Sequence, residues 1–598
     1  MEWLSMFEYK GAYFGSLTVA KETLDMMPDY VIRDDDVVIL TYPKAGTNWT
    51  IEIVNKLMRA AGKTDILAKD IPWFIEGRLP DFGKPGHVIV KDHPSPRIVH
   101  THLPRHLAPK MISNPTGKVK VIMVMRNPKD TAVSLYHYLE KYQVLLLGTA
   151  SVTTCNWDKF AQDFLDGFAP FGDFYDHALG WWQMKDDPHF LFLKYEDMKK
   201  DVSSAVGKMK EFLDITLDDV TTSDIVESCT IASLKAAWTE SGATTKSLIA
   251  RKGVVGDWKN TFTVPQSEAY DAKYKEKLEG TGLQFDFEFT FEGTKFLVAW
   301  NEIERRRYRK DALEMERWFK YKGAYFDPLL VTKETLDMMP DYVIRDDDVV
   351  ILTYPKAGTN WTIEIVNKLM RAAGKTDMQA KDIPWFIAGT LPEFGQPGHL
   401  IVKDHPSPRI VHTHLPWHLA PKMISNPKGK VKVIMVMRNP KDTAVSLYRF
   451  LEKFKDLSAT SLTTATWEKC AQDFLDGIAP HGDFYDHALG WWQMRDDPHF
   501  LFLKYEDMKK DLSSAVGKIK GFLDITLDDV TTSDIVESCA IASLKAAWTE
   551  SGAQTKSLIA RKGVVGDWKN TFTVAQSEAY DAKYREKLEG TGLQFDFE

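Results

Sequence analysis

One unit is written twice in this chain of 598 residues. The segment KETLDMMPDYVIRDDDVVILTYPKAGTNWT starts at Lys21 and recurs unchanged from Lys333. The offset is 312 residues in the first part of the unit and 310 residues from AQDFLDG onward, so two residues were gained or lost in between. Both copies end in LQFDFE, at Glu288 and Glu598. A period of about 300 residues is far longer than a solenoid repeat and indicates duplication of a whole domain.

We therefore predict two domains, 1–288 and 319–598, joined by a linker at 289–318. The linker contains no Pro, and its second half has the composition of a charged helix, with Glu preceding Arg. We interpret it as a solvated spacer. The alternative is a nucleic-acid or membrane patch, and the Glu interspersed among the Arg argue against that alternative.

Composition narrows the class of protein. The net charge of −8 argues against a general nucleic-acid binder, which needs a dominant basic surface. Four Cys without a CxxC pair form neither a disulfide framework nor a typical zinc site. The N-terminus lacks the pattern of a signal peptide, and no apolar run reaches the roughly 20 residues of a membrane helix. We expect a cytoplasmic protein that binds neither nucleic acid nor membrane.

Each copy alternates between strand and helix patterns. Short apolar runs bounded by Pro or charge predict buried strands, and apolar residues at helical spacing predict helices between them. In the first copy the predicted strands are 35–43, 97–104, 118–128 and 189–198, the last followed by a turn, and the predicted helices are 46–62 and 130–142, with Asp130 as a cap. Such alternation is typical of an α/β fold with a parallel sheet.

The segment TYPKAGTNW (41–49) lies between a predicted strand and a predicted helix. Gly46 lets the backbone approach an anion, Lys44 adds a positive charge, and the helix N-terminus offers free N–H groups. The segment does not match the Walker pattern GxxxxGK[ST], which disfavours ordinary nucleotide hydrolysis. By itself the segment also fits a tight turn with a surface lysine.

Two further segments are rich in anion-binding side chains. MRNPKDTAVS places Arg126 at a strand end and Ser134 in the following helix, and RKGVVGDWKN begins with basic residues at 251–252. A forked guanidinium beside an ammonium suits a terminal phosphate. The RKG segment alone is weak evidence, because basic loop residues are usually solvated.

These three segments resemble motifs of the cytosolic sulfotransferase family. TYPKAGTNW resembles that family's TYPKSGTTW loop, MRNPKDTAVS its 3′-phosphate segment, and RKGVVGDWKN its C-terminal signature. The resemblance covers nearly all of 9–288 and 321–598. It implies two copies of a P-loop-like α/β domain, each with a central parallel sheet flanked by helices. It also implies transfer of a sulfuryl group from 3′-phosphoadenosine 5′-phosphosulfate to a hydroxyl or amine of a small acceptor, with no metal required.

The resemblance assigns the donor-binding residues in both copies. In the first copy these are Lys44, Ala45, Gly46, Thr47 and Asn48 for the 5′-phosphosulfate, Trp49 and Tyr195 for the adenine, and Arg126, Ser134, Arg251, Lys252 and Gly253 for the 3′-phosphate. In the second copy they are Lys356, Ala357, Gly358, Thr359, Asn360, Trp361, Tyr505, Arg438, Ser446, Arg561, Lys562 and Gly563. Lys44 and Lys356 are also assigned a catalytic part, because they would neutralise charge on the leaving phosphate.

The segment VHTHLP holds His100 and His102, which point the same way if the segment is a strand. The residues alone leave three interpretations open: a structural histidine, a metal ligand and a general base. No characteristic metal-ligand spacing is present nearby, and an imidazole with an ordinary pKa of about 6.5 suits proton removal at pH 7. The resemblance to the family's KTHLP motif implies that His102 and, in the second copy, His414 are the bases.

The chain departs from the family pattern at two places in each copy. His100 and His412 stand where many members have Lys, and an imidazole supplies less positive potential at neutral pH. Ile231 and Ile541 stand where the family usually has a Phe that faces the adenine. We expect weaker donor affinity but a surviving site.

The acceptor is left open by the sequence: phenols, steroids, amines and retinoid-like alcohols all remain. The copies differ in regions that border the acceptor pocket by resemblance: IPWFIEGRLPDFGKPG (71–86) becomes IPWFIAGTLPEFGQPG (383–398), and 137–160 differs from 449–470. Drift in surface loops is an equally good explanation. Two alternative functions remain, a phosphoryl transferase and a nucleotide-binding scaffold with one decayed copy.

The segments Lys259–Glu268 and Lys569–Glu578 resemble the family's short dimer motif, KxxxTVxxxE. We predict that an extended TFTV stretch in each pairs with its counterpart, so that one chain mimics a homodimer. The alternative is that the linker holds the two segments apart and each pairs with another chain.

Overall fold

Four parallel strands form the centre of each half of the chain. The computed structural model describes residues 6–71, 74–77, 84–147, 156–240, 252–288, 318–328, 330–380, 383, 386–389, 397–457, 466–550 and 562–598. The chain divides into two compact units, Met1–Glu292 and Gly293–Glu598, called here the first and second domains. The predicted linker lies almost entirely outside the described residues.

The sheet of the first domain has the strand order β4-β3-β5-β6. All neighbours are parallel, and the register aligns Ile39 of β3 with His100 of β4 and with Ile122 of β5. The strands are β3 (Val37–Thr41), β4 (Ile98–Thr101), β5 (Lys120–Met125) and β6 (Phe190–Lys194). The second domain repeats the order as β10-β9-β11-β12, with β9 (Val349–Thr353), β10 (Ile410–Thr413), β11 (Lys432–Met437) and β12 (Phe500–Lys504). The predicted parallel α/β fold is confirmed.

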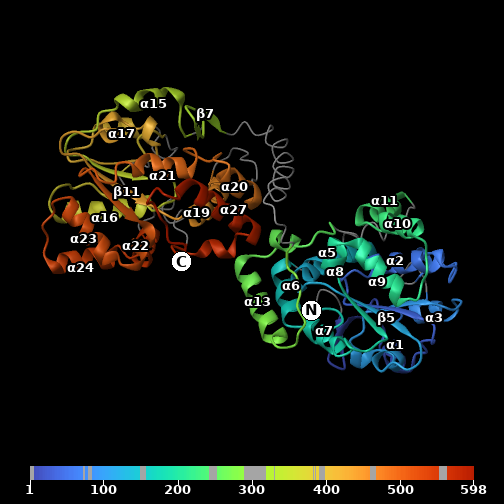
Figure 1. Cartoon of the computed structure of the whole chain (residues 1–598). Helices are drawn as coiled ribbons and strands as arrows, with labels where there is room; N and C mark the ends of the chain where they lie inside the picture. Colours follow the sequence, from blue (N-terminus) through green and yellow to red (C-terminus); the bar gives the residue numbers. More distant parts are fainter. Residues whose placement is uncertain are drawn as a thin grey trace. The chain divides into compact units, whose positions relative to one another are not determined.

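Helices cover both faces of each sheet, and this is why β3 is buried along its whole length. In the first domain α2, α9 and α10 pack on one face, while α6, α7 and α13 lie on the other side of the strands (Figure 1). The helices of the first domain are α1 (Lys21–Met26), α2 (Thr47–Ala60), α3 (Gly86–Lys91), α4 (Lys110–Ser113), α5 (Pro128–Leu147), α6 (Trp157–Leu165), α7 (Phe174–Trp182), α8 (Tyr195–Lys200), α9 (Val202–Phe212), α10 (Asp219–Ser228), α11 (Ile231–Glu240) and α13 (Val264–Leu278).

The second domain repeats this arrangement around β11 (Figure 1). Its helices are α15 (Lys333–Met338), α16 (Thr359–Ala372), α17 (Gly398–Lys403), α18 (Lys422–Ser425), α19 (Pro440–Leu457), α20 (Trp467–Leu475), α21 (Phe484–Trp492), α22 (Tyr505–Lys510), α23 (Leu512–Phe522), α24 (Asp529–Ser538), α25 (Ile541–Glu550) and α27 (Val574–Leu588). The first described elements of each domain form an antiparallel hairpin, β1 (Met6–Tyr9) with β2 (Ala12–Gly15), and β7 (Phe319–Tyr321) with β8 (Ala324–Phe326).

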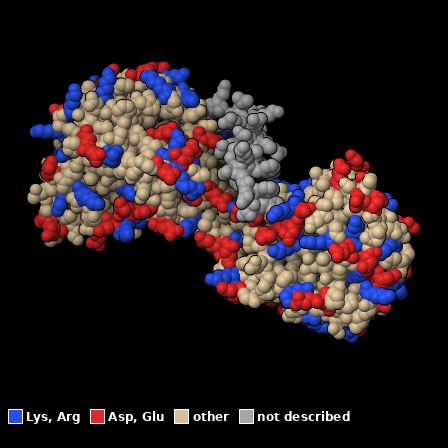
Figure 2. Space-filling model, in the orientation of Figure 1, with Lys and Arg blue, Asp and Glu red and all other residues tan. Residues whose placement is uncertain are grey.

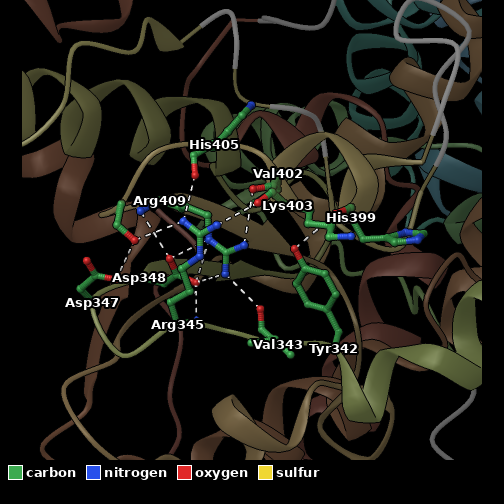
Figure 3. A network of polar contacts seen from close by, with 11 residues as sticks. Tyr342, Val343, Arg345, Asp347, Asp348, His399, Val402, Lys403, His405 and Arg409 are labelled. Atoms are coloured by element: carbon green, nitrogen blue, oxygen red, sulfur yellow. Dashed lines mark hydrogen bonds and ion pairs between the residues drawn. The ribbon is translucent and has the colours of Figure 1, made fainter.

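A buried ion pair ties the amino ends of two strands together. Arg409, just before β10, donates through Nε to Asp348, just before β9, at 2.9 Å, and both side chains are almost fully buried (Figure 3). The Arg345 guanidinium donates to the carbonyls of Lys403 and His405 at 2.8 and 2.9 Å. Breaking one partner of such a pair costs about 3–5 kcal/mol. The network therefore fixes the end of the sheet opposite to the carboxyl ends of the strands.

The predicted helix cap was wrong. The helix predicted at 130–142 is α5, which begins at Pro128; Asn127 takes the capping role, because its side chain accepts the Asp130 N–H at 2.8 Å. The buried Asp130 carboxylate instead accepts the N–H groups of Gly256 and Trp258 at 2.9 and 3.0 Å. Asp130 thus fastens the loop 252–257 to the start of α5.

The TFTV stretch is extended only in part: Thr263 has φ −71° and ψ 163°, whereas Val264 is helical. Thr263 caps α13 through a capping box with Gln266, and Val264 is the first residue of that helix. Phe262 is fully buried and packs its ring 5.0 Å from Trp157 and 4.7 Å from Tyr270. Extended backbone is thus found at Thr263, between the buried Phe262 and the first residue of α13.

Acidic and basic side chains are interspersed over the visible face of each domain (Figure 2). This mixture agrees with the small net charge of the chain, −8 among 598 residues.

Candidate active site

The predicted residues follow the carboxyl ends of four neighbouring strands. In the first domain Lys44 comes after β3, His102 after β4, Arg126 after β5 and Tyr195 after β6. Because carboxyl ends of parallel strands meet at one edge of the sheet, residues that are up to 151 positions apart converge there.

In the second domain the corresponding residues line a cavity of about 230 Å³. The predicted residues on its wall are Lys356, Gly358, Thr359, Asn360, Trp361, His412, His414, Arg438, Ser446, Tyr505 and Gly563. Ala357 and Lys562 are not on the wall, and Arg561 and its counterpart Arg251 lie outside the described residues. One cavity thus gathers the loop, the histidines and most of the predicted phosphate ligands.

The loop between β3 and α2 contains two residues with positive φ, and its backbone can be approached closely by a ligand. Lys44 has φ 72° and Gly46 has φ 123°, a conformation that L side chains rarely adopt. A Cβ on Gly46 would lie 3.1 Å from Cδ2 of Tyr195, so the glycine also makes room at the site. The first N–H groups of the 14-residue helix α2 have no intrahelical acceptor, so they can bind an anion, and they are called here the anion cradle. Lys356 and Gly358 repeat the geometry with φ 72° and 114°.

An aromatic and aliphatic slot lies next to this cradle. Trp49 is fixed by a 2.7 Å hydrogen bond from its Nε1 to the Cys229 carbonyl, and its ring meets that of Tyr195 edge-on at 5.4 Å. A Cβ on Gly253 would come within 2.9 Å of Ile231 Cγ2, so Ile231 closes the slot where an aromatic ring was expected from the family. In the second domain the corresponding residues, Trp361, Tyr505, Ile541 and Gly563, line the cavity.

The guanidinium of Arg126 is buried, and one of its N–H donors has no hydrogen-bond partner. It stacks 4.3 Å over the Tyr195 ring and donates to the carbonyls of Lys44 and Val254 at 3.3 and 3.4 Å. Its Nε is buried without a hydrogen-bond partner, and the Nε of Arg438 in the second domain is in the same state. A buried, unsatisfied cationic donor indicates a site for an anion. Lys252 is held by Asp257 at 3.0 Å.

The base candidate His102 has a defined tautomer. Its Nδ1 lies 2.8 Å from the Thr41 carbonyl, which only accepts, so Nδ1 carries the hydrogen and Nε2 carries the lone pair. The Thr41 hydroxyl lies 3.2 Å from the same nitrogen and 2.7 Å from the Thr47 hydroxyl in the first turn of α2. The imidazole is therefore positioned by the strand that leads into the anion cradle. In the second domain His414 Nδ1 lies 2.8 Å from the Thr353 carbonyl.

The ordinary histidine pKa expected from the sequence was wrong. Burial, together with the charge of Lys44, lowers the pKa of His102 to about 4. Burial, together with the charge of Lys356, lowers the pKa of His414 to about 4 as well. Both imidazoles are consequently neutral at pH 7 and already in the form that accepts a proton.

The expectation that the two strand histidines face the same space is confirmed. The ring centroids of His100 and His102 are 5.8 Å apart, and those of His412 and His414 are 5.6 Å apart. In the second domain both rings line the cavity.

The sequence analysis missed Glu76, a buried carboxyl group beside the base candidate His102. Glu76 accepts the backbone N–H of His102 at 2.7 Å and the Thr101 hydroxyl at 2.8 Å. Burial raises the pKa of Glu76 to about 7. The second domain has Ala388 at this place. The signal was present in the sequence, since Glu76 is the charged residue of the otherwise apolar IPWFIEG and is replaced in the second copy.

A second missed pair is Phe171 and His481. Phe171 packs its ring 5.3 Å from His102, and His481 packs its ring 5.5 Å from His414. The signal was the change from APFGDF to APHGDF within an otherwise repeated segment.

Within the described residues, no cluster of three or more His, Cys, Asp or Glu side chains is arranged to hold a metal ion. None of the helices in the same residues is both long and apolar enough to span a bilayer.

Known proteins match each half of the chain separately. The family profile described as "Sulfotransferase domain" matches residues 34–282 and again 346–592. The chain belongs to the sulfotransferase family. This sulfotransferase is 35% identical to the amine sulfotransferase of Oryctolagus cuniculus over 286 residues, which are 46% of this chain and 92% of the relative. It is 36% identical to Sulfotransferase 2A1 of Homo sapiens over 279 residues, 45% of this chain and 94% of the relative.

Solved structures are similar to parts of the chain as well. The crystal structure of mouse sulfotransferase SULT7A1 complexed with PAP shares 29% identity, with a TM-score of 0.39, and covers 46% of this chain and 95% of that chain. The double match of the family profile shows that the chain contains two sulfotransferase domains in tandem.

Proposed function

We propose that each domain transfers a sulfuryl group from 3′-phosphoadenosine 5′-phosphosulfate to a hydroxyl or amine of a small acceptor. The observation that carries the proposal is the direct connection of an anion cradle to a neutral imidazole, through Thr47, Thr41 and His102. Anion binding and proton acceptance are the two demands of sulfuryl transfer to an O–H or N–H group.

The donor-binding residues fit such a ligand. The N–H groups at the start of α2 and Lys44 would hold its 5′ end, and Trp49 and Tyr195 would border the adenine. Arg126, whose Nε is buried without a partner, and Ser134 would hold the 3′-phosphate. When bound, this donor supplies an activated sulfuryl group with a phosphate as its leaving group.

His102 would accept the proton of the acceptor at Nε2. The imidazole is neutral before the ligands enter because its pKa is about 4. An anion beside Lys44 offsets the charge of that lysine, which removes one of the causes of the low pKa and makes the imidazole a stronger base. Lys44 then stabilises negative charge on the leaving group.

Calorimetric titration of the full chain tests the donor and the number of sites. We expect two equivalents of adenosine 3′,5′-bisphosphate to bind, about 10²-fold more tightly than AMP, because charge-assisted hydrogen bonds to the 3′-phosphate contribute roughly 1.5–3 kcal/mol each. In the Arg126→Ala variant only one equivalent of adenosine 3′,5′-bisphosphate should bind tightly, in the second domain. Tighter binding of ATP would favour the phosphoryl transferase, and a single equivalent in the unmodified chain would favour a scaffold with one decayed copy.

We propose in addition that Lys259–Glu268 and Lys569–Glu578 associate with each other. The proposal rests on the resemblance to the family's dimer motif. Light scattering at micromolar protein should give a mass near 68 kDa if the pairing is within one chain. About twice that mass, abolished by Val264→Glu with Val574→Glu, would contradict pairing within the chain.

A further inference from the structure

The cavity of the second domain contains an imidazole, that of His481, which the proposed sulfuryl transfer does not require. Beyond the donor residues, the wall of this cavity includes Phe326, Phe386, Phe450, His412, His414 and His481. His414 is the base and His412 is its neighbour on the strand. His481 comes from the turn before α21 and has no part in the proposed proton transfer.

His481 is held firmly in place. Its backbone has φ 67°, and its N–H donates to the Tyr325 carbonyl at 2.8 Å. Its ring packs at 5.4 Å from Phe326, 5.7 Å from Phe386 and 5.5 Å from His414. The side chain has therefore little freedom to turn away from the cavity.

One nitrogen of this ring is unsatisfied. His481 is 7% exposed, and its Nδ1 is buried without a hydrogen-bond partner. Burial, together with His414 and His487, lowers the pKa of His481 well below its ordinary range, so the ring is neutral. A neutral imidazole has one N–H donor and one lone pair, and a buried unpaired nitrogen is unfavourable unless a ligand satisfies it.

In the first domain the position of His481 is taken by an apolar residue, Phe171. Phe171 has φ 71°, and its N–H donates to the Tyr13 carbonyl at 2.7 Å, as His481 does to Tyr325. Its ring packs 5.5 Å from Phe14 and 5.3 Å from His102. Backbone and ring position are thus alike in the two domains, and the difference is the hydrogen-bonding capacity of the ring.

We propose that His481 determines acceptor specificity in the second domain by hydrogen-bonding to a second polar group of the acceptor. The proposal rests on the proposed sulfotransferase function. The ring centroids of His414 and His481 are 5.5 Å apart, so one small molecule can reach both. The acceptor class is a small alcohol or phenol with another hydroxyl or carbonyl beside the reacting hydroxyl, as in a catechol. The first domain takes the analogue with an apolar substituent at that place.

The test compares catechol with 2-methylphenol, which replaces the second hydroxyl by a methyl group. In the His102→Ala variant the measured activity comes from the second domain, and in the His414→Ala variant it comes from the first domain. We expect the catechol to 2-methylphenol ratio of kcat/KM to be about tenfold higher for the second domain, since a site built for a polar group rejects the apolar analogue. Adding His481→Phe should lower the ratio to that of the first domain, and adding Phe171→His to the other chain should raise it.

Binding distinguishes failure of this proposal from failure of the proposed function. The same two phenols are titrated by calorimetry into the unmodified chain and His481→Phe, both saturated with adenosine 3′,5′-bisphosphate. A selective loss of catechol binding in His481→Phe supports the role of His481 even if no sulfuryl transfer is detected. Equal ratios in the two domains, with catechol binding unchanged by His481→Phe, would overturn the proposal.

Discussion

The two domains agree where the donor is proposed to bind and differ where the acceptor is proposed to bind. Trp49 and Trp361 donate to the Cys229 and Cys539 carbonyls at 2.7 and 2.8 Å, and the lysine of each loop has φ 72°. Around the base, by contrast, a buried carboxyl becomes a methyl group and a phenyl ring becomes an imidazole.

This contrast separates chemistry from recognition. The groups that would hold the donor and remove the proton depend on backbone geometry that both copies retain. The side chains that differ lie beside the proposed base without replacing it, so we expect them to alter the selectivity and the pH response of a domain and to leave its proposed reaction the same.

The largest effect expected from this comparison concerns Glu76, which the second domain lacks. Its pKa rises from an ordinary 4.5 to about 7, so between these pH values the folded domain holds a proton that the unfolded chain releases. The stability that this group gives is present below pH 4.5 and is lost as the pH rises through about 7, a difference of about 3 kcal/mol.

Glu76→Gln removes this dependence, because an amide does not titrate. The free energy of unfolding of the variant relative to the unmodified chain should rise between pH 5 and pH 8, as measured by thermal unfolding of the full chain. The exposed Glu22→Gln serves as the control and should show no such trend. A pH-independent difference for Glu76→Gln would mean that the carboxyl is ionised in the fold throughout.

How far the sequence predicted the molecule depends on the range of the interactions involved. The strands and the loop at 41–49 could be predicted, because buried apolar runs that end in Pro or Gly specify them locally. The sequence marks Glu76 as a charged residue in an apolar segment, but its role could not be predicted, because its partners Thr101 and His102 are brought to it by the sheet. The low pKa of His102 likewise follows from burial, which no local pattern reveals.

A second prediction concerns the part of the site that the domains share. Gly46→Ala places a Cβ at a positive φ and 3.1 Å from Tyr195. Backbone strain of about 1–3 kcal/mol should weaken adenosine 3′,5′-bisphosphate binding by roughly 5- to 100-fold in the first domain alone. Gly358→Ala should do the same in the second domain.

Gly207→Ala is the control for this pair, because a Cβ there meets no atom within 4 Å. Calorimetry should show one weakened and one unchanged site in each single loop variant. Two weakened sites after Gly46→Ala alone would show that the domains do not bind independently.

The smallest effect concerns the ring beneath the loop lysine. The Lys44 Nζ lies 4.7 Å from the Tyr138 ring centre, and Lys356 lies 4.6 Å from Phe450. Since phenyl and phenol rings both attract a cation, Tyr138→Phe should change kcat of the first domain less than about twofold. The measurement uses the His414→Ala background. A tenfold loss would reveal a role for the Tyr138 hydroxyl that the second domain lacks.

The central claim is that both domains are sulfotransferases that use His102 and His414 as bases. The most direct measurement is the initial rate of transfer from labelled 3′-phosphoadenosine 5′-phosphosulfate to a panel of phenols, alcohols and amines, with adenosine 3′,5′-bisphosphate binding measured in parallel. Each single His→Ala variant should retain the activity of the other domain, and the double variant should lose roughly 10²–10⁴ in rate while both nucleotide sites still bind. A double variant whose rate stays within about tenfold of the unmodified chain would contradict the account.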